Sequence, residues 1–311
     1  MDVAPPLLQP GPLSAAPRHG ELPEGIAGHM ADKEYRALAA PRWPATANLV
    51  ALGLSILVTV RNQEATIAQA VSDILNVDYP CPMELIVVDD ASTDGTYDVL
   101  ARVGDDRVTV YRHLVRRGKS AALQTAGSLA AGSHLLLLDV GPEYSADDIP
   151  RVLRPVLTGR CQVVYGARLS GYNTVYRSRR QVRAVRMLTL LANVLFDACV
   201  KDLYGGFKLI PRAMFGELTL REGGAGLDTE ITALLLKRGV RPFEVPVSYH
   251  GGAACAAAEI SRRQVAACVG ILFRVRLRRR AAGAPHAQHA HDHAYDGAVI
   301  CSDHPNLSEA C

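Results

Sequence analysis

The stretch ELIVVDDASTDGT at residues 84–96 constrains the fold more than any other part of the chain. The four apolar residues Leu85 to Val88 precede two acids, which is typical of a strand buried on both faces that ends at Asp89 and Asp90. Helix-capping residues and a helical pattern follow, so the stretch predicts a strand, a tight turn and a helix. Strand ends of this kind line the ligand crevice of open α/β sheets. Acids in turns are also common structural features, so both interpretations stay open here.

The same alternation of apolar runs and helical patterns continues along the chain. It predicts further strands at 55–60, 108–113, 134–140, 162–168 and 241–249. Helices are predicted after the first strands and at 145–157, 179–200 and 228–238. Strands that alternate with helices at these intervals indicate βαβ units, so the fold class is α/β with a parallel sheet flanked by helices.

Length and composition fit one large domain with tails, although 311 residues would also allow two domains. The Pro- and Ala-rich residues 1–47 are predicted to be a disordered leader, and 48–250 to be the folded domain. Residues 251–280 are predicted to contain a basic amphipathic helix, and the His-rich tail 281–311 to be disordered. A flexible tail is a better interpretation of those histidines than a metal site.

Charge and cysteine usage narrow the possible partners and compartment. A net charge of +3 is too small to indicate a nucleic-acid partner. The seven cysteines are scattered without a CxxC pair, which favours a reducing cytoplasm over a disulfide framework. We see neither a secretory signal pattern nor an apolar run long enough to span a bilayer.

Several motifs, taken in order, resemble glycosyltransferase family 2, and within it the polyprenyl-phosphate (dolichol-phosphate) mannosyltransferase branch. They are VVDDASTDGT, RRGKSAAL, LLLLDVGPEY, VVYGAR, KDLYGGFKL and GLDTEITALLLKRG, and the resemblance covers about residues 54–250. It implies a GT-A type fold with a Rossmann-like, mixed but mainly parallel sheet. It also implies transfer of a sugar from a nucleoside-diphosphate sugar to a polyprenyl phosphate or a similar acceptor.

The resemblance also implies roles for individual residues. Asp89 and Asp90 would bind the base and Asp139 the ribose. The full set implied for the nucleotide is Asn62, Glu64, Asp89, Asp90, Lys119 and Asp139. The set implied for catalysis is Asp139, Arg168, Asp202 and Lys208, in which Arg168 and Lys208 face phosphates and Asp202 lies near the acceptor. A leaving diphosphate needs such cations because negative charge develops as the glycosidic bond breaks.

The chain departs from the family pattern at three places. The metal-binding DxD motif reads Asp139-Val140-Gly141, which leaves Asp139 and Glu143 as the local ligands for Mg²⁺ or Mn²⁺. We therefore expect the metal to bind weakly or not at all. Arg61 stands where the family has an aromatic neighbour of the base, and Gly and Ala residues at 251–258 replace a basic phosphate clamp.

Three functional hypotheses follow from these residues. The first is an active transferase, and the alternative is a degenerate relative that binds nucleotide or acts as a regulatory partner. A nucleotide-sugar enzyme of another reaction type is the third. The basic helix within 251–280 allows peripheral contact with the inner face of a membrane, although a helix that packs one face on the domain explains it equally well.

Overall fold

The structure is a computed structural model that describes residues 52–139, 141, 144–168, 174–175, 179–250 and 261–278. The chain divides into two compact units, Met1–Arg276 and Leu277–Cys311. The fold described below belongs to the first unit. The predicted leader 1–47, the whole of the tail 281–311 and Glu143 lie outside the described residues. The predicted domain boundaries therefore stay predictions.

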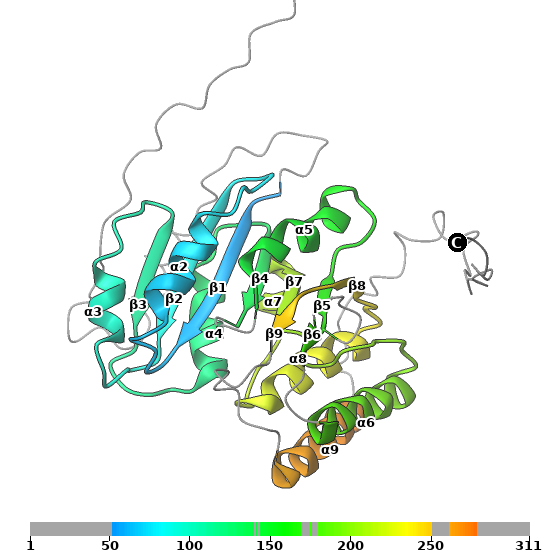
Figure 1. The fold of residues 1–311 in the computed structure, drawn as a ribbon. Helices are drawn as coiled ribbons and strands as arrows, with labels where there is room; N and C mark the ends of the chain where they lie inside the picture. Colours follow the sequence, from blue (N-terminus) through cyan, green and yellow to red (C-terminus); the bar gives the residue numbers. More distant parts are fainter. Residues whose placement is uncertain are drawn as a thin grey trace, which may run out of the picture. The chain divides into compact units, whose positions relative to one another are not determined.

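A seven-stranded sheet forms the centre of the domain (Figure 1). Its order is β3 (Val108–Arg112), β2 (Met83–Asp89), β1 (Leu54–Val60), β4 (His134–Leu138), β7 (Phe207–Pro211), β5 (Val164–Ala167) and β8 (Phe243–Pro246). Only β7 runs antiparallel to its neighbours, β4 and β5. The predicted α/β class with a mixed, mainly parallel sheet is confirmed. Beside this sheet, β6 (Thr174–Val175) pairs in parallel with β9 (Tyr249–His250).

Helices cover both faces of the sheet because the central strands carry apolar side chains on both sides. One face packs against α2 (Ile67–Leu75), α3 (Thr96–Ala101) and α5 (Ile149–Leu157), which follows the short helix η1 (Ala146–Asp148). The other packs against α4 (Lys119–Leu129), α6 (Arg179–Phe196), α7 (Arg212–Gly216), α8 (Ala225–Lys237) and α9 (Arg262–Leu277). In β1, for example, Ile56 and Leu57 are both buried but belong to opposite cores.

The helix α9 lies within the range 251–280 for which the sequence predicts a basic amphipathic helix. Cys268, Ile271, Leu272 and Val275 are its buried side chains, and they join the same core as α6 and α8. In the part of the chain that the structure describes, we find no helix with both the length and the apolar character needed to cross a bilayer.

The antiparallel strand β7 decides which residues meet at one edge of the sheet. Its first residue, Phe207, pairs with Leu138 at the end of β4, and Lys208 pairs with Tyr165 of β5. The beginning of β7 and the ends of β4 and β5 therefore share an edge. Asp139 and Arg168, which directly follow β4 and β5, lie at that edge beside Lys208.

Candidate functional site

Two loops at the ends of β1 and β2 hold each other through side chains; we call residues 61–66 and 90–95 the loop pair. The backbone N–H of Asn62 donates to Ser92 Oγ (2.9 Å), and Asn62 Oδ1 accepts from the N–H of Thr93 (2.9 Å). Glu64 Oε2 accepts from the N–H of Gly95 (2.9 Å). Asn62 adopts a left-handed backbone (φ 53°), which asparagine tolerates better than most residues. Asn62 and Glu64 thus fix the shape of the loop pair.

Asp89 and Asp90 are both buried at the end of β2 but have different partners. Asp89 Oδ1 accepts from the N–H of Ser92 (3.0 Å), while Oδ2 makes no hydrogen bond and lies 3.4 Å from Arg112 Nε. Asp90 accepts from the N–H groups of Arg117 (2.7 Å) and Gly118 (2.8 Å). Asp90 therefore holds the loop that leads into α4.

The ring of His113 completes the surroundings of Asp90. His113 Nδ1 lies 2.9 Å from Asp90 Oδ1, and its Nε2 lies 3.1 Å from Thr125 Oγ1. Burial alone would raise the pKa of Asp90, but the hydrogen bonds from His113 and the two backbone N–H groups lower it. Asp90 is therefore a carboxylate at neutral pH. No motif in the sequence identified His113 as part of the site.

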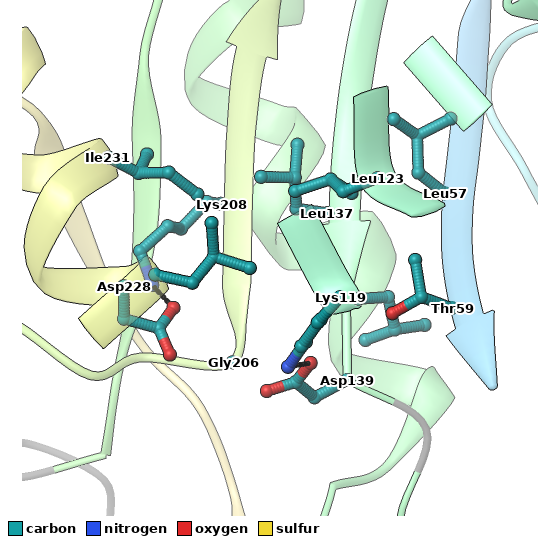
Figure 2. A pocket seen from close by; sticks show the side chains of 12 residues that line it. Leu57, Thr59, Lys119, Leu123, Leu137, Asp139, Gly206, Lys208, Asp228 and Ile231 are labelled. Carbon is teal, nitrogen blue, oxygen red and sulfur yellow. Dashed lines mark hydrogen bonds and ion pairs between the residues drawn. The ribbon is translucent and has the colours of Figure 1, made fainter. Parts of the chain in front are cut away.

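Lys119, the first residue of α4, forms an ion pair with Asp139 (Figure 2). Its Nζ lies 2.5 Å from Asp139 Oδ1, and the two side chains are 35% and 44% exposed. Burial alone would raise the pKa of Asp139, but the charge and hydrogen bond of Lys119, together with the charges of Lys208 and Arg168, lower it. Because Asp90 fixes the backbone just before Lys119, the end of β2 also positions this lysine.

A second ion pair lies across the same small cavity, as Figure 2 shows. The buried Nζ of Lys208 donates to Asp228 Oδ1 (2.6 Å) and to the carbonyl oxygen of Gly205 (2.7 Å). Both ion pairs line the cavity, whose volume is about 20 Å³, enough for about one water molecule. The apolar residues Leu57 and Ile231 close its inner side.

The third ion pair is buried and bidentate. Arg168 Nε and Nη2 donate to the two carboxylate oxygens of Asp202 at 2.8 Å and 3.0 Å, and the N–H of Arg168 donates to Oδ2 (3.1 Å). Burial would raise the pKa of Asp202, but the guanidinium of Arg168 outweighs it and lowers the pKa. The guanidinium of Arg168 also lies over the ring of Tyr249, 5.2 Å from its centroid.

Tyr144 connects these pairs to β7. Its hydroxyl accepts from the N–H of Gly206 (2.9 Å), and its ring lies edge-on to Phe207 and Tyr249. A Cβ on Gly206 would lie 2.4 Å from the tyrosine ring, so this close approach requires glycine. Burial raises the pKa of the Tyr144 hydroxyl well above its usual value, and the nearby charges of Arg168, Asp202 and Asp139 act on it less strongly.

We call the set Lys119, Asp139, Arg168, Asp202, Lys208 and Asp228 the charged edge. It contains every residue for which the resemblance implies catalysis, and the structure brings them together. The sequence analysis missed Asp228, Tyr144 and His113. The signal for Asp228 was the acid in GLDTE, in the first turn of α8, where the helix dipole stabilises a carboxylate.

The described residues do not fit a divalent metal well. Among them we find no cluster of three or more His, Cys, Asp or Glu side chains that could hold an ion. Asp139 already has the ammonium of Lys119 on one oxygen, and Gly141 supplies no carboxylate. Mg²⁺ requires near-octahedral oxygen coordination. The expected partner Glu143 lies outside the described residues.

The arrangement can bind an anion near the end of β4 and polar groups near the loop pair. Parallel strands that end at acids and cations form the ligand crevice of Rossmann-like folds. Fold and site together define a GT-A type α/β domain. Residues 55–219 match the family described as Glycosyl transferase family 2, which is more than half of the chain, and the chain belongs to that family.

Glycosyltransferase AglJ of Haloferax volcanii is 26% identical over 199 residues, which cover 63% of this chain and 62% of that protein. The chain thus spans less than two thirds of this relative. Glucosyl-3-phosphoglycerate synthase from Mycobacterium tuberculosis, solved with Mn²⁺, UDP-glucose and phosphoglyceric acid, has a TM-score of 0.56 at 20% identity. The alignment covers 80% of this chain and 85% of that one.

The structure of mannosyl-3-phosphoglycerate synthase from Rubrobacter xylanophilus resembles this chain to a similar degree, with a TM-score of 0.54 at 21% identity. That alignment covers 75% of this chain and 79% of the solved one. At these identities the two solved structures support the fold alone.

Proposed function

We propose that the protein transfers a sugar from a nucleoside-diphosphate sugar to an acceptor. The observation that carries this proposal is the Lys119–Asp139 ion pair at the end of β4, beside the acids of β2 and the loop pair. A nucleotide there would place its base and ribose against Asp89, Asp90, Asn62, Glu64 and Asp139. Its diphosphate would lie toward Lys119.

The charged edge would stabilise the leaving diphosphate as the glycosidic bond breaks. Lys119 is the partly exposed cation of the set, so it can move from Asp139 to an incoming phosphate without opening the core. Lys208 and Arg168 are buried and already paired, so they contribute fixed positive charge. Such preorganised charge lowers a transition-state barrier because it needs no reorganisation during the reaction.

We propose only a minor role for Mg²⁺ or Mn²⁺. A solved structure of similar fold contains Mn²⁺ with its UDP-sugar, but the donor set described here is one carboxylate that a lysine already contacts. If a metal binds, Asp139 would hold it, together with Glu143. The metal would then supply the positive charge beside the diphosphate that Lys119 otherwise provides.

For the acceptor we propose a polyprenyl phosphate, following the resemblance of KDLYGGFKL and GLDTE to the mannosyltransferase branch. Asp202, held by Arg168, would lie on the acceptor side of the charged edge. An acceptor of this kind is embedded in lipid, so we propose a cytoplasmic protein in peripheral contact with the inner face of a membrane. No nucleic-acid partner is proposed.

The test is transfer of radiolabelled sugar from UDP- and GDP-sugars to polyprenyl phosphate, with and without Mn²⁺. We expect a labelled lipid product whose formation depends weakly on metal. Loss of the product in Lys119→Gln but not in Arg160→Gln would assign the activity to the charged edge, because Arg160 is exposed in the loop before β5, at the opposite edge.

A second candidate function is a nucleotide-binding partner without turnover. The observation that favours it is that Gly141 replaces the second acid of the metal motif. In that case nucleoside diphosphates would bind, but no labelled lipid would form with any sugar donor. Failure of every nucleotide to bind would contradict both candidates.

A further inference from the structure

A continuous stripe along α6 is exposed and takes no part in the charged edge. Its first half presents arginines and its second half presents large apolar side chains: Arg179, Arg180, Arg183, Arg186, Met187, Leu190 and Val194. Residues three, four and seven apart share one face of a helix, so these side chains form one surface, the α6 stripe. Leu188 and Ala192 face the core instead.

The apolar half of the α6 stripe is unusually exposed for such side chains. Met187, Leu190 and Val194 are 54%, 64% and 72% exposed. They follow one another along the helix at the spacing of a single face, so the exposure is contiguous. A contiguous exposed apolar patch beside charged residues typically marks an interaction surface.

Helix α9 lies beside α6 (Figure 1) and also carries exposed basic and apolar residues. Arg276 Nε donates to the carbonyl oxygen of Leu195, which joins the two helices (2.8 Å). Ala266, Gly270 and Phe273 are exposed at one-face spacing on α9, and Arg262 and Arg263 precede them. Neither helix sequence contains an acid, while each contains four arginines.

This charge pattern discriminates between possible occupants. A second copy of the chain packed on the same stripe would place arginines either against arginines or, in the antiparallel orientation, against the apolar half of the partner, and both contacts are unfavourable. An anionic bilayer can bind both halves of the α6 stripe. Basic side chains contact lipid phosphates, and apolar side chains enter the boundary between headgroups and acyl chains.

We propose that the α6 stripe docks on the surface of an anionic lipid bilayer. The apolar half lies in the headgroup–acyl boundary, and the arginines contact the lipid phosphates. This surface is separate from the charged edge and binds without nucleotide, sugar or acceptor. Docking would bring a lipid-linked acceptor to the protein, but it does not depend on the proposed transfer reaction.

The test is co-sedimentation of the full chain with vesicles, without nucleotide. We expect binding to vesicles of equal parts phosphatidylcholine and phosphatidylglycerol, little binding to phosphatidylcholine alone, and release by high salt. Because each basic side chain at an anionic surface contributes a roughly fivefold factor, Arg183→Gln with Arg186→Gln should weaken binding about 25-fold. Leu190→Glu should weaken it at least tenfold.

Leu157→Glu is the matched control, because Leu157 is also an exposed leucine (39%) but lies on α5, on the opposite face of the sheet. It should bind vesicles like the unchanged protein. Circular dichroism should show that all variants are folded, since the changed side chains are exposed. Three results would overturn the proposal: equal binding to both vesicle types, unchanged binding of Leu190→Glu, or a dimer in sedimentation equilibrium that Leu190→Glu dissociates.

Discussion

The loop pair and the charged edge both place carboxylates at the ends of strands, but they hold them in different ways. Asp90 accepts from two backbone N–H groups of a neighbouring loop and also contacts the ring of His113, so the chain geometry around it largely fixes it. Asp139, Asp202 and Asp228 each pair with a side-chain cation from another element. The difference indicates that the loop pair is held in one shape, whereas the exposed Lys119–Asp139 pair of the charged edge can rearrange more easily.

Within the charged edge, exposure separates the three ion pairs. Lys119–Asp139 is partly exposed, whereas Lys208 and the Arg168–Asp202 pair are nearly or fully buried. A buried charge that loses its partner is costly, so the buried pairs should act mainly through stability and fixed charge. The exposed pair is the one that can exchange its partner at low cost.

The largest expected effect is on the buried pair. Asp202→Ala removes the carboxylate that accepts from the guanidinium of Arg168 and should lower the free energy of unfolding by about 3–5 kcal/mol. Urea denaturation followed by circular dichroism measures the loss. The double variant Arg168→Met with Asp202→Leu should recover most of it, because it leaves no buried charge. A loss of similar size in the double variant would show that packing, not charge, holds this region.

Asp90→Ala tests the other region and should cost less. It removes the carboxylate that accepts from two backbone N–H groups and contacts the ring of His113. We therefore expect the free energy of unfolding to fall by about 1–3 kcal/mol in the same denaturation experiment. It should also weaken nucleoside-diphosphate binding, because the loop before Lys119 loses its anchor. Unchanged diphosphate binding would contradict the link from Asp90 to Lys119.

The dependence of stability on pH should report on the Arg168–Asp202 pair. The folded-state pKa of Asp202 is lowered, so its contribution is fully present above the unfolded value of about 3.9 and is lost as the pH falls through the folded value. Urea midpoints measured below pH 5 should therefore fall more steeply in the wild type than in the Arg168→Met, Asp202→Leu variant. Equal slopes would contradict the assignment.

The smallest expected effect concerns metal. Gly141→Asp restores a second carboxylate near Asp139 and should strengthen Mn²⁺ binding, which isothermal titration calorimetry detects directly. The ammonium of Lys119 on Asp139 limits the gain, so the double variant with Lys119→Gln should bind Mn²⁺ more tightly than Gly141→Asp alone. If neither variant binds more tightly than the wild type, residues 139–141 do not occupy the metal motif.

The sequence predicted the sheet well because its strands are continuous apolar runs that end at acids, as in β2 and β4. The resemblance also implied that Asp89, Asp90 and Asp139 belong to one nucleotide site, and these acids do lie at the ends of neighbouring parallel strands. The sequence could not predict that Arg168 pairs with Asp202 or Lys208 with Asp228, because those contacts depend on the antiparallel insertion of β7. It placed the start of the last domain helix at Asp228, whereas α8 begins at Ala225.

The sequence also could not show how the acids of β2 are used. Asp89 and Asp90 are adjacent and chemically identical, yet one leaves an oxygen beside Arg112 and the other holds the α4 loop. The two acids differ in their partners only because residues 112–118 fold beside them in the three-dimensional structure.

The most direct test of the central claim is calorimetric titration of UDP and GDP, compared with uridine and guanosine, without metal. We expect one nucleoside diphosphate to bind, and Lys119→Gln to weaken it about tenfold or more, because a charge-assisted hydrogen bond contributes about 1.5–3 kcal/mol. Binding of the matching nucleoside should not change, nor should Arg160→Gln alter either affinity. Absence of binding by both diphosphates, with or without Mn²⁺, would contradict the account.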